Sequence, residues 1–155
     1  MRKRVIEPSV SAAAEPVWLD LNRLASVEYS SEAAAYPVEA ALVPGTGPGW
    51  RAAGPGEQRI RLVFDQRVNL GRVGLWFSED ARERTQEFVL SWSPESGQPG
   101  REILRQQYHF SPLAATREVE DYRVELEGVK LLELRIVPDI SGGDACASLD
   151  RLRLA

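Results

Sequence analysis

Strict alternation of apolar and polar residues, in four separate stretches, is the feature that most constrains what this chain can fold into. A period of two places successive side chains on opposite faces of a strand, so each stretch has one apolar face and one polar face. The apolar members are Ile60, Leu62 and Phe64; Val73, Leu75 and Phe77; Phe88, Leu90 and Trp92; and Leu132, Leu134 and Ile136. This pattern predicts a β-sandwich, with the apolar faces packed against one another.

Further strands are predicted at short intervals, separated by segments rich in Gly, Pro, Asp and Ser. No run of ten or more residues between them has the 3.6-residue period of a helix, which disfavours βαβ units and a parallel sheet. Eight strands are predicted, over residues 24–29, 59–64, 71–77, 86–92, 102–110, 118–127, 131–137 and 148–154. The expected fold is therefore all-β: an eight-stranded antiparallel jelly-roll β-sandwich.

A length of 155 residues suits one domain. Residues 1–16 are expected to form an N-terminal arm, because a stretch of small residues without a period lies there between prolines, and residues 17–155 are expected to form the sandwich. The connection over residues 30–58 is unusually long. Residues 44–49 are rich in Pro and Gly and are predicted to form a loop. Residues 31–35 and 38–42 could form short helical turns.

Composition narrows the class of protein and its expected location. The net charge is −4, from 19 basic and 23 acidic residues of interspersed sign, so a nucleic-acid partner is not expected. No apolar run is long enough for a membrane span or a signal peptide, and no membrane partner is expected. Cys146 is the only cysteine, which excludes an intrachain disulfide and favours a reducing, cytoplasmic location. Two of the 19 basic residues are lysines, and this excess of arginine is typical of GC-rich bacterial genomes.

Several short motifs follow one another in a recognisable order: Gly49-Trp50-Arg51-Ala52-Ala53-Gly54, the strands at 58–64 and 88–93, the segment 68–75 and the closing segment 147–154. This order resembles the discoidin, or coagulation factor type C, domain and its galactose-binding-like relatives, from about Trp18 to the end of the chain. The resemblance implies an eight-stranded jelly roll that binds a ligand through loops at one end; many members bind sugars, and others bind lipids, proteins or nicked DNA.

Two departures from the family pattern bear on calcium and on location. The Asp-Gly that helps hold calcium in many members is replaced here by Leu42-Val43-Pro44-Gly45, and the disulfide of secreted members is absent. Asp139, Asp144 and Asp150 could supply oxygen ligands, but Asp residues near glycines more often form turns. No cofactor is expected, and calcium in particular is disfavoured.

Antiparallel strands place alternate connections at the same end of the sandwich, and this predicts where a ligand binds. The connections 30–58, 78–85, 111–117 and 138–147 share one end, which has the longer loops. Arginine side chains can donate hydrogen bonds to carboxylates, phosphates or hydroxyls, and a tryptophan ring can stack on a sugar. The commoner roles of these residues are structural: arginines form exposed ion pairs, and tryptophans pack in the core. The predicted ligand-binding residues are Trp50, Arg51, Arg82, Arg84 and Arg117.

Trp76 suggests an alternative function for the surface on which it lies. It has the parity opposite to the core residues Leu75 and Phe77, so it is expected to face outward. It could be covered by the terminal arm through Trp18, lie in an interface with another protein or a second copy, or stack on a ligand. Trp18 and Trp76 are the predicted interface residues, and either a monomer or a homodimer is compatible with them.

No catalytic motif and no zinc site is found, and an enzyme is not expected. His109 is the single histidine, it has no nucleophile in a recognisable context, and Cys146 is expected to be buried and inert. The predicted function is a non-enzymatic module that binds carbohydrate through its loops; the alternative is a protein-interaction or scaffold domain that uses the face around Trp76. Trp50-Arg51-Ala52-Ala53 and Gly56-Glu57 also resemble the N-terminal domain of the vertebrate single-strand-break repair scaffold, but the net charge of −4 counts against phosphate binding.

Overall fold

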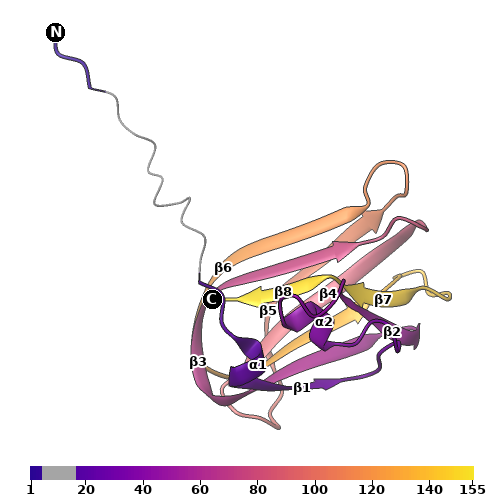
Figure 1. Ribbon diagram of the computed structural model, residues 1–155, viewed down its shortest axis with the longest axis horizontal. Helices are drawn as coiled ribbons and strands as arrows, with labels where there is room; N and C mark the ends of the chain where they lie inside the picture. Colours follow the sequence, from indigo (N-terminus) through magenta and orange to yellow (C-terminus); the bar gives the residue numbers. More distant parts are fainter. Residues whose placement is uncertain (5–16) are drawn as a thin grey trace.

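The structure, a computed structural model, describes residues 1–4 and 17–155 (Figure 1). Most of the expected N-terminal arm, residues 5–16, lies outside the described residues. The elements in chain order are α1 (Leu21–Leu24), β1 (Ala25–Tyr29), α2 (Glu39–Leu42), β2 (Trp50–Pro55), β3 (Gln58–Ser78), β4 (Arg84–Ser93), β5 (Arg101–Phe110), β6 (Arg117–Val137), β7 (Cys146–Leu149) and β8 (Arg151–Leu154).

All strand pairs are antiparallel, and the two long strands β3 and β6 connect the two layers of the sandwich. The main sheet has the order β1-β3-β6-β4-β5, β8 pairs with β3, and β2 pairs with β7. The first half of β3 pairs with β1 and the second half with β8, while β6 follows β3 along both halves. Register shifts between Val63 and Arg72 bend the pair where it passes from one layer to the other. The expected all-β, antiparallel jelly-roll sandwich is confirmed.

The same bend explains a change of parity in the core. Ile60, Leu62 and Phe64 are even-numbered and Val73 and Leu75 are odd-numbered, yet all are at most 2% exposed. Extra residues at the register shifts reverse which side of the strand faces inward. Each apolar face therefore still meets the core after the strand has changed layers.

The strand boundaries differ from the prediction although the described residues contain eight strands. The predicted strands at 59–64 and 71–77 are the halves of β3, and those at 118–127 and 131–137 are the halves of β6. The last predicted strand is divided at Asp150 into β7 and β8. β2 was not predicted, because its small residues lie in a segment that has no alternating pattern. α2 falls within the predicted helical turn at 38–42, whereas α1 was not expected.

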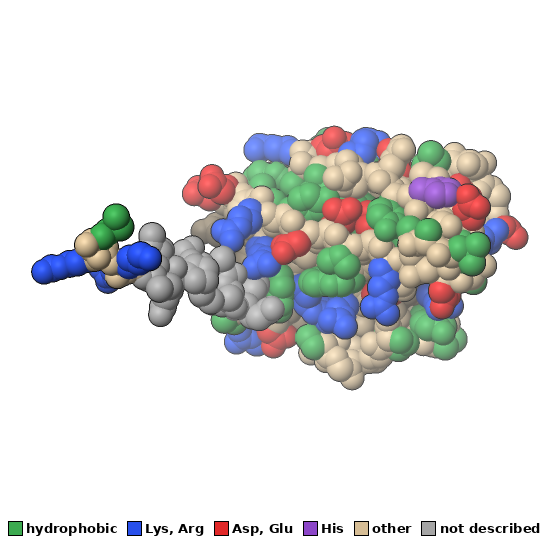
Figure 2. Space-filling view, turned by 90° about the horizontal axis from the view of Figure 1, so that it is seen from above, with side chains coloured by type: hydrophobic (Ala, Val, Ile, Leu, Met, Phe, Trp, Pro, Cys, Tyr) green, Lys and Arg blue, Asp and Glu red, His purple; other side chains and the backbone are tan. Residues whose placement is uncertain are grey.

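Four connections meet at one end of the sandwich, at the right in Figure 1, as the antiparallel order predicted. They are the segment before β2, the β3–β4 loop, the β5–β6 loop and the β6–β7 loop. Basic and acidic side chains are mixed over the face seen in Figure 2. Among the described residues, no helix is long and apolar enough to cross a membrane.

Candidate functional site

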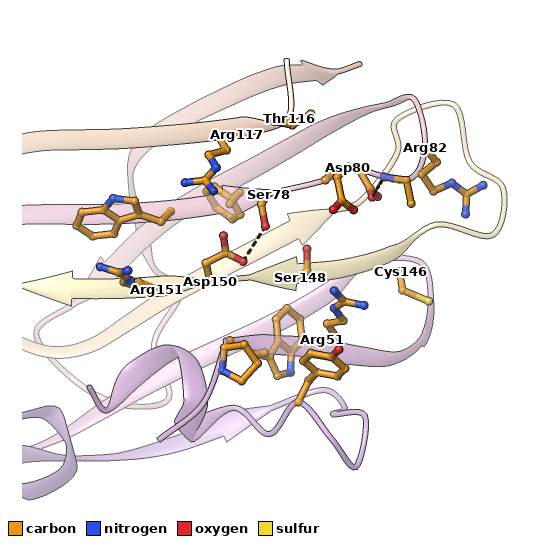
Figure 3. Close-up of a pocket in the computed structure, with 18 of the residues that line it drawn as sticks. Arg51, Ser78, Asp80, Arg82, Thr116, Arg117, Cys146, Ser148, Asp150 and Arg151 are labelled. Atoms are coloured by element: carbon orange, nitrogen blue, oxygen red, sulfur yellow. Dashed lines mark hydrogen bonds between the residues drawn. The ribbon is translucent and has the colours of Figure 1, made fainter. Parts of the chain in front are cut away.

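A cleft of about 740 Å³ opens at the end where these connections meet. One wall comes from β2 and the segment before it, and the other from the end of β3, the β3–β4 loop and the start of β6; the β7–β8 junction lies between the walls (Figure 3). The lining residues are Tyr36, 48–51, 76–82, 116–117, Val119, Asp144, Cys146, Ser148, Asp150 and Arg151. The cleft thus combines residues from distant parts of the sequence.

Asp150 lies at the centre of the cleft, at the break between β7 and β8. Its backbone N–H donates to the carbonyl oxygen of Trp76 at 2.8 Å, and its Oδ1 accepts a hydrogen bond from the Ser78 hydroxyl at 3.0 Å (Figure 3). Burial raises the pKa of the Asp150 carboxyl, while the Ser78 hydrogen bond and the charges of Arg117, Arg151 and Arg51 act in the opposite direction. A half-buried carboxylate beside three guanidinium groups is a strong and directional acceptor for a polar ligand.

Gly49 sets the distance between β2 and this break. A Cβ atom on Gly49 would lie 2.8 Å from the Leu149 carbonyl oxygen and 2.9 Å from the Asp150 Cα, and Gly49 has a φ of +134°. Only glycine allows the two backbones to come this close in this conformation. The Gly49-Trp50-Arg51 motif therefore fixes one wall of the cleft directly against its centre.

Of the predicted ligand-binding residues, Arg51 and Arg117 line the cleft and are exposed. The Arg51 guanidinium lies over the Tyr36 ring, 4.2 Å from the centroid. Figure 3 shows Arg117 and Arg151 on either side of Asp150, with Arg51 on the β2 wall. The structure thus brings two predicted arginines together with a third, Arg151, which was not predicted.

Arg82 and Arg84 belong to the same loop region but differ in their surroundings. Arg82 lines the cleft and is paired with Asp144, with 2.6 Å between Nη2 and Oδ1. The side chain of Arg84 is 1% exposed, and it donates to Glu79 Oε1 at 2.9 Å and to the Pro138 carbonyl oxygen at 2.8 Å. The prediction that Arg84 contacts ligand is wrong, because its parity is that of the β4 core face and its donors are already used inside the protein.

Trp50 is also not available for stacking. It is 1% exposed, and its indole N–H donates to the Ser31 carbonyl oxygen at 2.9 Å. The prediction that Trp50 contacts ligand is wrong, since a ring enclosed by the core cannot present a face to a sugar. Trp50 instead closes the end of the sandwich beneath the cleft.

Trp76 faces outward, as its parity predicted, and it lies at the edge of the cleft. Its ring covers Gly74, where an added Cβ would lie 2.7 Å from the ring atoms Cη2 and Cζ3. Trp18 meets it edge-on, with 6.4 Å between the ring centroids. Arg151 pairs with Trp76 across the strands, and its guanidinium lies 5.9 Å from the ring centroid. Of the three alternatives for Trp76, contact with Trp18 is present in the structure, and Trp76 also borders the cleft.

The other candidate residues do not form a further site. Asp139 accepts a hydrogen bond from the Ser141 N–H, in the manner of a turn residue. Within residues 1–4 and 17–155 no three His, Cys, Asp or Glu side chains are grouped so that they could hold a metal ion. His109 is exposed and lies 2.8 Å from both Glu83 Oε1 and Thr85 Oγ1. Cys146 was expected to be buried; it is exposed at the cleft margin, because β7 begins there.

Sequence reasoning missed the roles of Arg151 and Ser78 in the cleft. Both have the outward parity that the closing segment and the strand at 71–77 indicate, since Leu152 and Phe77 point into the core. The sequence does not show which residues of the neighbouring strands lie beside Arg151 and Ser78. The register pairs Arg151 with Trp76 and Ser78 with Arg117, and a single sequence does not give this register.

No family model and no curated protein matches the sequence. Among solved structures, the family 32 carbohydrate-binding module (CBM32) of AlyQ, in complex with 4,5-unsaturated mannuronic acid, has a TM-score of 0.64 at 16% identity, over 90% of this chain and 98% of that one. The family 32 module of Clostridium perfringens NanJ, in complex with galactose, has a TM-score of 0.63 at 8% identity, over 88% and 96%. CpGH89CBM32-5 of the same species, in complex with GalNAc-β-1,3-galactose, also has 0.63, at 14% identity, over 89% and 99%. At these identities the comparisons establish the fold: this chain has the discoidin-like jelly roll of the family 32 modules.

Proposed function

We propose that this protein is a non-enzymatic module that binds carbohydrate in the cleft around Asp150. The observation that carries the proposal is the convergence of Asp150, Ser78 and three exposed arginines at one end of the sandwich. Three neighbours with the same fold, described above, are carbohydrate-binding modules in complex with sugars. Binding alone accounts for these groups, and no covalent step is needed.

The chemistry of the cleft suits a saccharide. Sugars present hydroxyl groups that both donate and accept hydrogen bonds, together with C–H faces that pack on aromatic rings. Asp150 can accept from hydroxyls, Arg117 and Arg151 can donate to them, and Trp76 supplies an aromatic edge beside them. The Asp150 backbone N–H bonds to Trp76 and its carboxyl group accepts from Ser78, so this central acceptor needs little ordering on binding.

The alternative function, a protein-interaction or scaffold domain using the face around Trp76, is less well supported. The neighbours named above do not favour it. Trp76 already contacts Trp18, and it also borders the cleft. A ligand in the cleft would use the same exposed aromatic surface that an interface would need.

A glycan array with the full-length chain, followed by calorimetry with the strongest hit, tests the proposal. Arg117→Ala combined with Trp76→Ala should weaken binding by at least about tenfold, because charge-assisted hydrogen bonds and aromatic contacts are lost. Arg67→Ala is the matched control, since Arg67 is exposed and bonds to Pro94 and Glu95 outside the cleft. No glycan binding by the native chain, or equal affinity in the cleft variant, would contradict the proposed function.

A further inference from the structure

We propose that the saccharide bound in the cleft is acidic, and that Arg117, Arg151 and Arg51 bind its carboxylate beside Asp150. This inference rests on the proposed function and adds the chemical class of the ligand. It comes from the way in which charge is distributed within the cleft.

The outer part of the cleft, around the β3–β4 loop, has two ion pairs and one further acid, Asp80. Arg82 is paired with Asp144 at 2.6 Å, and Glu79 is paired with the buried Arg84 at 2.9 Å. Figure 3 shows Asp80 and Arg82 together at the β3–β4 loop, away from Asp150. This part of the cleft therefore has no surplus of positive charge to offer an anion.

The inner part of the cleft has such a surplus. Within the part of the chain that the structure describes, the guanidinium groups of Arg51, Arg117 and Arg151 have no hydrogen bond or ion pair with a side chain. Arg51 and Arg151 lie against the rings of Tyr36 and Trp76 instead. All three arginines line the cleft together with Asp150, and the charge of each lowers the pKa of the Asp150 carboxyl. The inner part of the cleft therefore holds three positive charges and one carboxyl group.

Two features suit this surplus to a carboxylate. The arginines come from three separate elements, β2, β6 and β8, so they approach a ligand from different sides of Asp150 (Figure 3). A guanidinium group donates two parallel hydrogen bonds to a carboxylate, and such charge-assisted pairs are roughly twice as strong as neutral hydrogen bonds. Asp150 would then accept from a hydroxyl of the same sugar ring, which orients the ring relative to its acid group. A neutral sugar would use the hydrogen bonds but leave the positive charge uncompensated.

Calorimetry of the full-length chain with paired saccharides tests the inference. The panel contains oligomers of galacturonate, mannuronate and glucuronate together with sialyllactose, each beside a neutral counterpart: the carboxyl-reduced oligomer, or lactose. At least one acidic member should bind about tenfold or more tightly than its neutral counterpart, with an affinity that falls as salt is raised. Arg117→Gln combined with Arg151→Gln should remove this preference, whereas Arg67→Gln should keep it. Both sets of arginines are exposed, and a thermal melt checks that the variants remain folded.

The inference and the proposed function fail in different ways. Equal or tighter binding of the neutral counterparts would overturn the acidic ligand but leave a carbohydrate module. Retention of the preference in the double variant would also overturn it. If no acidic member binds while neutral glycans bind on the array, the inference is again wrong and the proposed function stands. If no glycan of either kind binds, both are wrong.

Discussion

Glu118 gives the most quantitative prediction, because it is an acid enclosed between the two layers of the sandwich. It is 1% exposed; its Oε1 accepts a hydrogen bond from Gln86 Nε2 at 3.0 Å, and among the described residues its Oε2 has no hydrogen-bond partner. Burial, followed by the neighbouring Glu120, raises the pKa of Glu118 to about 8, and the charge of Arg84 only partly offsets this. At neutral pH Glu118 is therefore protonated, and the proton gives Oε2 a donor that can face Glu120.

The sign and size of the effect on stability follow from this pKa. Between the ordinary value of 4.5 and about 8, the folded state holds a proton that the unfolded state has lost. The free energy of unfolding therefore falls as pH rises through this window, with a slope approaching about 1.4 kcal/mol per pH unit. The contribution is fully present below pH 4.5 and lost above about 8. From pH 5 to pH 8 the loss amounts to about 4 kcal/mol as an upper bound.

Urea unfolding of the wild type and of Glu118→Gln, at five pH values from 5 to 9, measures this term. Glutamine keeps the acceptor for Gln86 and supplies a permanent donor toward Glu120, so the variant should match the wild type near pH 5 and exceed its stability by about 2–4 kcal/mol at pH 8 and above. Glu125→Gln is the control, because Glu125 is exposed on the same strand. If the curves for Glu118→Gln and the wild type stay parallel over the whole range, the reasoning about a protonated buried acid is refuted.

Three further outcomes are expected. Gly74→Ala should push the Trp76 ring away from the sheet and increase the quenching of its fluorescence by acrylamide, because a Cβ on Gly74 would lie 2.7 Å from the ring. Gly54→Ala is the control and should not change the quenching, because a Cβ on Gly54 would meet nothing within 4 Å. Arg84→Ala should lower the free energy of unfolding by about 3–5 kcal/mol, because it leaves buried partners unpaired, whereas Arg82→Ala should have a much smaller effect, because Arg82 and Asp144 are exposed; similar losses in both would show that burial does not distinguish them. Calcium or a chelator should leave the melting temperature unchanged, because the Asp-Gly step is absent from the long connection; a clear rise with calcium would reveal a site.

The fold could be predicted from the sequence because the alternation is strict where the strands are most buried. Ile60, Leu62 and Phe64 show the period without interruption, and their strand lies inside the main sheet, between β1 and β6. The same rule, extended backward from Phe88 in steps of two, would have placed Gln86 and Arg84 inside the sandwich. Because Arg84 and Gln86 are polar, the apolar alternation stops at Phe88, although the alternation of buried and more exposed side chains continues to Arg84.

The cleft was predicted only in part. Antiparallel order placed the loops at the correct end, and Arg51 and Arg117 lie there as expected. The role of Arg151 depends on the register of β8 against β3, and that of Asp150 depends on a break between two strands. Both are set by tertiary packing, including the close approach at Gly49, and neither has a local signature in one sequence.

An NMR titration of the labelled 155-residue chain with the best glycan-array hit shows whether carbohydrate binds in the cleft. Amide shifts should change in segments 49–51, 76–82, 116–119 and 146–151, while the opposite end around Arg67 and Glu95 remains unchanged. Shift changes confined to the groove of Arg59, Arg61 and Glu133 on the outer face of the main sheet would contradict binding in the cleft, because the ligand would then bind a surface that these four segments do not form.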